Sequence, residues 1–319
     1  MFVKYELDGF GEELRRIRKN IGYNQLDVEQ IVAISADTIR RIEAGQVIPR
    51  YETLELLSLV YKQDLLDVLK SYRCEKLLYE YHDDLDYAIT SGNKEKIKEL
   101  QNQIETNITS IDHTNILNPK EIDQFLAFIK ALKVHITGQL VEVQIAKVDL
   151  INNLRLTIPS FDLKKFDSYN YCYIEYRILL LISLLIVKEE KFSFSNKILY
   201  FILYELLNDK FKTQYIDSLI AKVYSNIAYN FHRLDEHPQV IKICIKGINY
   251  CLKNDVFRPL YLLYYRQGIA QYHLGVENYV TSVENAFYLL KSTGNNELLK
   301  KYIEVSKEKY GIIIPNFLS

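Results

Sequence analysis

The segment QLDVEQIVAISADTIRRIEAGQVIPRYETLELL, residues 25–57, decides the fold of the N-terminal part of the chain. It reads as a helix, a short turn, a second helix with Ser35 placed to cap its start, a stop at Gly45 and a further helix after Pro49. Working outward, residues 10–22 carry one apolar stripe at helical spacing, and a short helix is expected at 65–69. The short connections predict a compact bundle of five helices.

Helical patterns also fill the chain beyond this bundle. Only 11 Gly and 6 Pro interrupt the 319 residues, and no segment sustains period-two alternation, so we expect an all-α protein without sheet. A polar stretch at 105–120 is expected to be a loop. The further helices are expected at residues 71–91, 94–107, 121–137, 139–157, 168–188, 194–209, 213–233, 238–253, 258–274, 277–291 and 295–309.

The N-terminal bundle resembles the Xre/Cro family of phage-repressor helix-turn-helix domains. The resemblance is carried by Gln25, Ile34, Ser35, Ile39, Ile42, Glu43, Gly45 and Pro49. Three residues depart from the family pattern. Ala33 stands where the family often has a turn glycine, Glu29 replaces a small residue, and Asp37 lies in the base-reading part of the third helix. A left-handed turn at Ala33 would be slightly strained.

The resemblance implies a DNA-binding surface on the third helix. It places Ala36, Asp37 and Arg41 where the family reads bases. The residues that it places at phosphates are Gln25, Ser35 and Thr38. Arg40 also faces outward, and Arg50 adds positive charge. Residues 10–50 hold seven basic and six acidic side chains, so a single copy should bind DNA modestly and a dimer is expected. The alternative is a solvated bundle without DNA affinity.

Two segments further along the chain share a repeated layout. Residues 224–247 alternate large and small side chains in a way that resembles a tetratricopeptide repeat, and the layout returns about forty residues later. Any antiparallel helix pair gives similar apolar spacing, which is the alternative explanation. The expected fold is a five-helix DNA-binding domain at 1–70, followed at 71–319 by a right-handed superhelix of degenerate repeats for dimerisation and peptide sensing.

The first helix of each repeat pair is expected to line a concave groove. Its polar side chains would suit an extended peptide, because asparagine bonds both backbone groups and tyrosine gives adaptable contacts. The alternative is a polar helix face or a dimer surface. The predicted peptide-binding residues are Lys222, Asn226, Tyr229, Asn230, Arg233, Tyr265 and Arg266.

The whole-chain layout resembles the peptide-pheromone regulators of Gram-positive bacteria, the Rap/Rgg/NprR/PlcR/PrgX group. The resemblance implies a transcriptional regulator in which a short signalling peptide, bound by the repeats, controls how a homodimer holds operator DNA. Two alternatives stay open: a repeat protein that binds and restrains a partner protein, and a regulator of the same build without a peptide ligand.

Enzyme and membrane classes find little support in the sequence. No HExxH, GxxxxGK[ST] or GxSxG motif occurs, so we expect a non-enzyme without cofactor or metal. The acidic cluster at 79–86 is interpreted as a solvated helix face. The longest apolar run, residues 178–187, has half of the ~20 residues that a membrane span needs. The start has no apolar signal region and no CxxC pair occurs, which favours a cytoplasmic protein with reduced cysteines.

Overall fold

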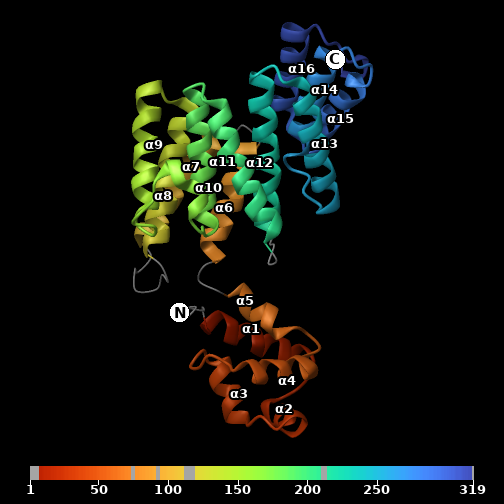
Figure 1. The fold of residues 1–319 in the computed structure, drawn as a ribbon. Helices are drawn as coiled ribbons and strands as arrows, with labels where there is room; N and C mark the ends of the chain where they lie inside the picture. Colours follow the sequence, from red (N-terminus) through yellow and green to blue (C-terminus); the bar gives the residue numbers. More distant parts are fainter. Residues whose placement is uncertain (1–6, 73–75, 91–93, 111–118, 210–213, 318–319) are drawn as a thin grey trace. The chain divides into compact units, whose positions relative to one another are not determined.

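The computed structural model describes residues 7–72, 76–90, 94–110, 119–209 and 214–317, and within these ranges it is helical with no strand (Figure 1). Contacts divide the chain into two compact units. The first consists of the described parts of 1–84 and 106–119, and the second of 85–105 and 120–319. The predicted all-α class is confirmed, while the functional domain boundary at residue 70 stays a prediction.

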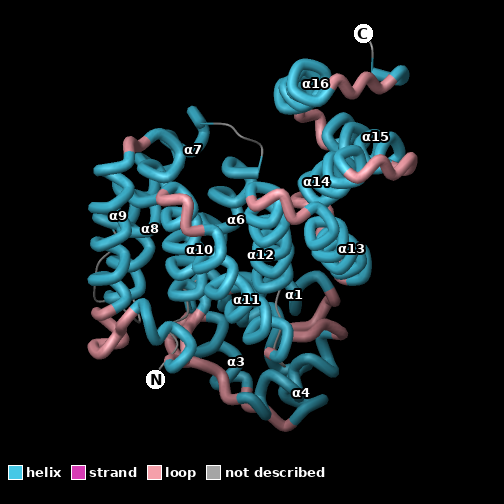
Figure 2. The backbone as a smooth tube through the Cα atoms, turned by 45° about the horizontal axis from the view of Figure 1, so that its top comes forward, coloured by secondary structure: helices cyan, strands magenta, loops and turns pink. Residues whose placement is uncertain are grey.

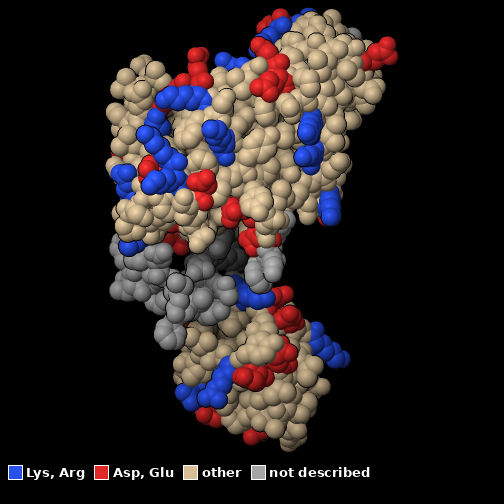
Figure 3. Space-filling model, viewed as in Figure 1, with Lys and Arg blue, Asp and Glu red and all other residues tan. Residues whose placement is uncertain are grey.

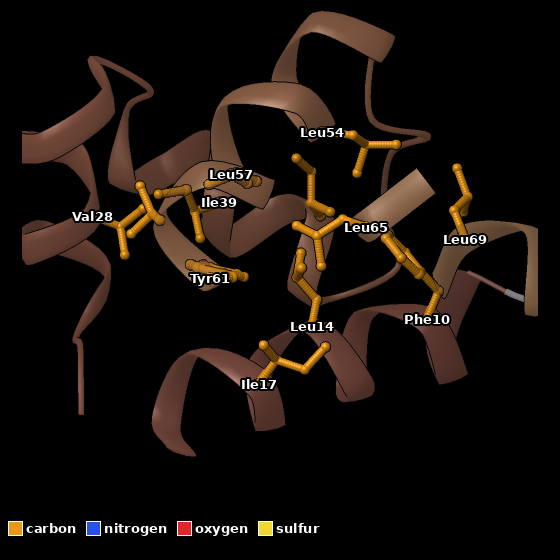
Figure 4. Close-up of a cluster of buried hydrophobic side chains, with 12 residues drawn as sticks. Phe10, Leu14, Ile17, Val28, Ile39, Leu54, Leu57, Tyr61, Leu65 and Leu69 are labelled. Carbon is orange, nitrogen blue, oxygen red and sulfur yellow. The ribbon is translucent and has the colours of Figure 1, made fainter. Parts of the chain in front are cut away.

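The first five helices form a bundle that we call the head. They are α1 (Leu7–Asn20), α2 (Gln25–Val32), α3 (Ala36–Glu43), α4 (Tyr51–Tyr61) and α5 (Leu65–Ser71). Their apolar faces meet in one core, which includes Phe10, Leu14, Ile39 and Leu57, all essentially inaccessible to solvent (Figure 4). Burying this apolar surface is the main force that holds such short helices in place, because isolated helices of this length are unstable in water.

Local sequence signals set the helix boundaries in the head. Asn24 begins α2 in a capping box with Asp27, and the Ser35 hydroxyl accepts a hydrogen bond from the backbone N–H of Thr38 at 3.2 Å. Ala33 has a φ of 54°, so it adopts the left-handed conformation that is slightly strained for a residue other than glycine. Gly45 follows α3 with a φ of 66°, a conformation that glycine adopts without strain.

Longer helices make up the rest of the described chain. They are α6 (Lys76–Thr90), α7 (Lys94–Ser110), α8 (Pro119–Thr137), α9 (Leu140–Leu154), α10 (Tyr173–Lys188), α11 (Phe192–Asn208), α12 (Gln214–Arg233), α13 (His237–Lys253), α14 (Leu260–His273), α15 (Tyr279–Ser292) and α16 (Asn296–Tyr310), with short 3-10 turns at η2 (Leu163–Ser168) and η3 (Pro315–Phe317). The loop expected from residue 105 is wrong as far as residue 110, because α7 continues to Ser110. It is also wrong at residues 119–120, which begin α8, and its middle part, 111–118, lies outside the described residues.

Helices α9 to α16 pack in sequence, each against the next, as consecutive helix pairs of a repeat array (Figure 2). Two glycines allow the helices to approach closely. A β-carbon on Gly247 would lie 2.9 Å from Cβ of Tyr224, and one on Gly268 would lie 2.6 Å from Cγ2 of Val283. Both glycines stand where the repeat pattern predicts a small residue, so helical repeats follow the head as expected.

The apolar run in α10 is buried among neighbouring helices. Within the described ranges, no helix combines the length and the apolar character that a bilayer crossing requires.

Candidate functional site

Helix α3 is held against the other helices of the head by its apolar side and by a close approach of its backbone to α1. Ile39 and Ile42 are buried on this side. On the facing helix, a β-carbon on Gly11 would lie 2.6 Å from the carbonyl oxygen of Glu43. Only a glycine fits there, because backbone atoms cannot move aside as a flexible side chain can. This contact fixes the end of α3 on α1.

A buried ion pair strengthens the same contact. Arg18 donates from Nε to Oε1 of Glu43 at 2.6 Å and from Nη2 to Oε2 at 2.8 Å. Its Nη1 donates to the Tyr23 carbonyl, and the Gln25 side chain donates to Oε2 of Glu43 at 2.8 Å. Gln25 was predicted to contact phosphate, but in this structure its amide is bonded to Glu43 and fixes α2 to α3.

The outer side of α3 carries the other predicted DNA contacts. Asp37 and Arg40 form an exposed ion pair at 2.6 Å, and the Arg40 hydrogen bond lowers the pKa of the Asp37 carboxyl. The hydroxyls of Ser35 and Thr38 share a hydrogen bond at 2.8 Å. Arg41 is exposed and makes no hydrogen bond or ion pair to any residue that the structure describes. Its guanidinium is therefore available to a ligand.

The remaining predicted contacts flank these groups. Ala36 is half-buried at the start of α3, and Arg50 is exposed immediately before α4. Acidic and basic side chains are interspersed on the face of the head that Figure 3 displays, in keeping with its near-neutral charge.

Sequence reasoning missed the role of Glu29. Its carboxylate accepts a hydrogen bond from the backbone N–H of Ala36 at 3.2 Å, so it occupies a donor at the N-terminus of α3. The clue was its departure from the family pattern. A carboxylate here interacts favourably with the positive end of the helix dipole, but it repels a phosphate group bound at the same place.

The second unit contains a cavity of about 420 Å³. Most of its wall comes from alternate helices, α8, α10, α12, α14 and α16, as expected for the inner face of a repeat array. The lining is mainly apolar, with Leu180, Leu219 and Tyr261 among its residues. Such a hollow, apolar with a few polar groups, is typical of a ligand-binding site.

Four charged residues line this cavity: Asp86, Arg177, Lys222 and Arg266. Asp86 accepts from Nη2 of Arg177 at 2.6 Å and forms an ion pair with Lys222. Burial opposes the charged form of Asp86, but the two cations hold the pKa of its carboxyl below its usual range. Arg266 has a buried Nε without a hydrogen-bond partner, and its guanidinium lies 4.9 Å from the centre of the Tyr229 ring.

The predicted peptide-binding residues separate into two groups. Lys222, Asn226 and Arg266 line the cavity. The ring of Tyr229 does not line it but contacts the guanidinium of Arg266. Asn230 does not line it: this side chain is buried and donates to Ser195 and Asn196 of α11, each at 2.9 Å.

The two other predicted residues also lie away from the cavity wall. The ring of Tyr265 packs 4.6 Å from that of Tyr302, and its hydroxyl is bonded to Ser306 at 3.0 Å. Arg233 is exposed at the end of α12 and stacks on Phe192. The described contacts of these two side chains are with other parts of the repeat array.

The interpretation of residues 79–86 as a solvated face is wrong for two of the titratable residues in this segment. His82 is buried, and Asp86 is buried in the ion-pair network of the cavity. Asp86 and its partner Arg177 are 91 residues apart, so local spacing could not reveal the pair.

Three histidines of the repeats, His232, His237 and His273, form a cluster of rings. His237 stacks on His273 at 4.4 Å between ring centres, and His232 lies within 6.0 Å of both. Burial, with Arg266 nearby, lowers the pKa of His232 to about 4. Within the described ranges, no group of three or more His, Cys, Asp or Glu side chains is arranged to hold a metal ion.

Both the sequence of the head and the fold of the chain resemble those of known proteins. Residues 10–68 match a family model described as a helix-turn-helix domain, so the head is a helix-turn-helix domain. No curated protein matches the chain in sequence. Solved structures, however, match its fold from end to end.

Three of the solved structures that share this fold are described here as examples. PlcR from Bacillus thuringiensis, in complex with the peptide PapR7 and DNA, is 16% identical with a TM-score of 0.66, covering 92% of this chain and 99% of that one. ComR from S. thermophilus, in complex with DNA and its signalling peptide, is 14% identical with a TM-score of 0.60, covering 95% and 100%. The SHP pheromone receptor Rgg2 from Streptococcus dysgalactiae is 13% identical with a TM-score of 0.55, covering 94% and 99%. At these identities the likeness establishes a shared fold.

Proposed function

We propose that this protein is a sequence-specific transcriptional regulator whose DNA binding is controlled by a short signalling peptide. The head, residues 1–70, binds operator DNA through α3. The repeats, residues 71–319, form a homodimer and hold the peptide on their inner face. The observation that carries this proposal is the cavity of about 420 Å³ in the repeats, which three of the predicted peptide-binding residues line. PlcR and ComR, which share the fold, were solved with DNA and a peptide.

The proposed DNA surface comprises Ser35, Ala36, Asp37, Thr38, Arg40, Arg41 and Arg50, with Gln25 beside it. Arg41 is the strongest candidate for a base contact. It is exposed on α3 and is not paired with a described residue, whereas Arg40 is already bonded to Asp37. An unpaired guanidinium fits the two acceptors of guanine in the major groove. The other polar groups would position the helix on the sugar-phosphate backbone.

A first prediction concerns Arg41. The protein selects its preferred site from a pool of random duplexes, and binding is then measured by fluorescence anisotropy. Arg41→Ala should weaken binding to the selected site by roughly 1–3 kcal/mol and binding to scrambled DNA much less, since a base contact carries the discrimination.

The matched control is Arg16→Ala, which removes an exposed arginine of α1 that is paired with Glu13. This change should affect the two DNAs alike. If Arg41→Ala leaves the ratio of selected to scrambled affinity unchanged, α3 is not the reading helix.

The proposed peptide site is the cavity wall formed by Lys222, Asn226 and Arg266, with Tyr229 behind Arg266. The side-chain amide of Asn226 donates to the Lys222 carbonyl at 2.8 Å, which leaves its oxygen to accept from a peptide N–H. The proposed role of Asn230, Arg233 and Tyr265 is weaker on geometric grounds, because these side chains do not line the cavity.

A further inference from the structure

The charges on the cavity wall do not balance. Three cations, Arg177, Lys222 and Arg266, face one carboxylate, that of Asp86. Both oxygens of Asp86 are already engaged, one by Arg177 and the other by Lys222. His135 also lines the cavity, but burial lowers its pKa to about 4, so it is neutral near pH 7. The cavity therefore has an excess of two positive charges.

Of the three cations that line the cavity, Arg266 is the one that has no acidic partner among the described residues. No acidic side chain lies within ion-pairing distance of it among the residues that the structure describes. Its neighbours Tyr261 and Tyr302 are neutral, because burial raises the pKa of both hydroxyls. A cation removed from water is costly unless an anion accompanies it. The guanidinium carbon of Arg266 lies 4.9 Å from the centre of the Tyr229 ring, and its buried Nε has no hydrogen-bond partner.

Resting on the proposed peptide-binding function, we propose that Arg266 anchors a carboxylate at the end of an otherwise apolar peptide. A guanidinium binds a carboxylate through two parallel hydrogen bonds, and the leucine-rich wall accepts apolar side chains. The excess positive charge repels the peptide's amino group. The carboxylate comes either from the C-terminus of the peptide or from a terminal acidic side chain.

The test uses two synthetic libraries of random heptapeptides that differ only in ending with a free carboxyl group or an amide. Full-length protein is immobilised, and retained peptides are identified by mass spectrometry. The free-acid library should be retained about tenfold better, with apolar residues enriched near its end. Enrichment of Asp or Glu at the end of the amide library identifies a side-chain carboxylate as the anchored group, whereas better retention of the free-acid library without that enrichment identifies the C-terminus.

Variants assign the preference to Arg266. Arg266→Gln should retain both libraries equally, whereas Arg266→Lys should keep a reduced preference because it keeps the charge. Lys246→Gln removes an exposed cation of α13 and should behave like the wild type. If Arg266→Gln fails to fold, the two libraries on wild-type protein and Arg266→Lys still decide the question.

Two results separate this inference from the proposed function. Equal retention of both libraries by the wild type, without acidic enrichment, overturns the carboxylate anchor but leaves peptide binding intact. Retention of neither library removes peptide binding and the anchor together.

Discussion

Glu43 joins three helices of the head through one carboxylate. It accepts from Arg18 of α1 and Gln25 of α2 while standing at the end of α3. Both members of the ion pair are almost completely buried. Because a buried charge without its partner is expensive, this network has a defined role in holding α3.

Replacing Glu43 therefore tests the network. Glu43→Ala should lower the free energy of unfolding by roughly 3–5 kcal/mol, because it leaves the buried Arg18 guanidinium without its carboxylate partner. Urea titration followed by circular dichroism measures this change. Asp37→Ala is the matched control, because it removes one member of an exposed pair that water and salt screen, and it should lower the stability far less. Equal effects of the two substitutions would contradict the network's role.

At the scale of elements, most helix bodies follow from apolar periodicity, and their ends follow from caps. The start of α10 is an exception. A helix was expected from residue 168, but α10 begins after Cys172, whose backbone N–H donates to the Glu175 carboxylate, and η2 occupies 163–168. Aromatic packing of Phe166 on Phe201, a contact distant in sequence, competes with local helix propensity there.

The candidate site divides in the same way. Ser35 and Arg41 were proposed from the resemblance to the Xre/Cro family and Arg266 from the repeat pattern, because the place of each depends on a single helix. The Asp86–Arg177 pair and the wall that α16 contributes depend on packing between distant segments. No local pattern encodes such contacts.

Buried histidines make the helical repeats sensitive to acid. Burial lowers the pKa of His135 and of His232 from 6.5 to about 4. As the pH falls below 6.5, the unfolded chain binds protons at these rings while the folded chain does not. The stability that they contribute is thus complete above pH 6.5 and is lost progressively towards pH 4.

Urea midpoints at pH 7.5 and 5.5 measure this effect. The wild type should be less stable at the lower pH, and His135→Phe should show a smaller loss because it removes one of the two rings. A similar loss in wild type and variant would mean that His135 does not contribute.

At the scale of the whole molecule, peptide control of DNA binding requires that the repeats influence the head. A peptide changes DNA affinity only if it binds one arrangement of the dimer better than another, and a tenfold change needs about 1.4 kcal/mol of such preference. With seven basic and six acidic residues between positions 10 and 50, one head should bind DNA only modestly, so the proposed function needs two copies for tight binding. In this proposal the homodimer is the unit on which the peptide acts.

The most direct measurement is the affinity of full-length protein for its selected DNA site, with and without a saturating peptide retained from the heptapeptide libraries. Saturation is established by calorimetry, and DNA binding is followed by fluorescence anisotropy. We predict at least a tenfold change in the dissociation constant, and Arg266→Gln should lose that change at the same peptide concentration while keeping its affinity without peptide. An unchanged dissociation constant for the wild type at full peptide occupancy would contradict the account.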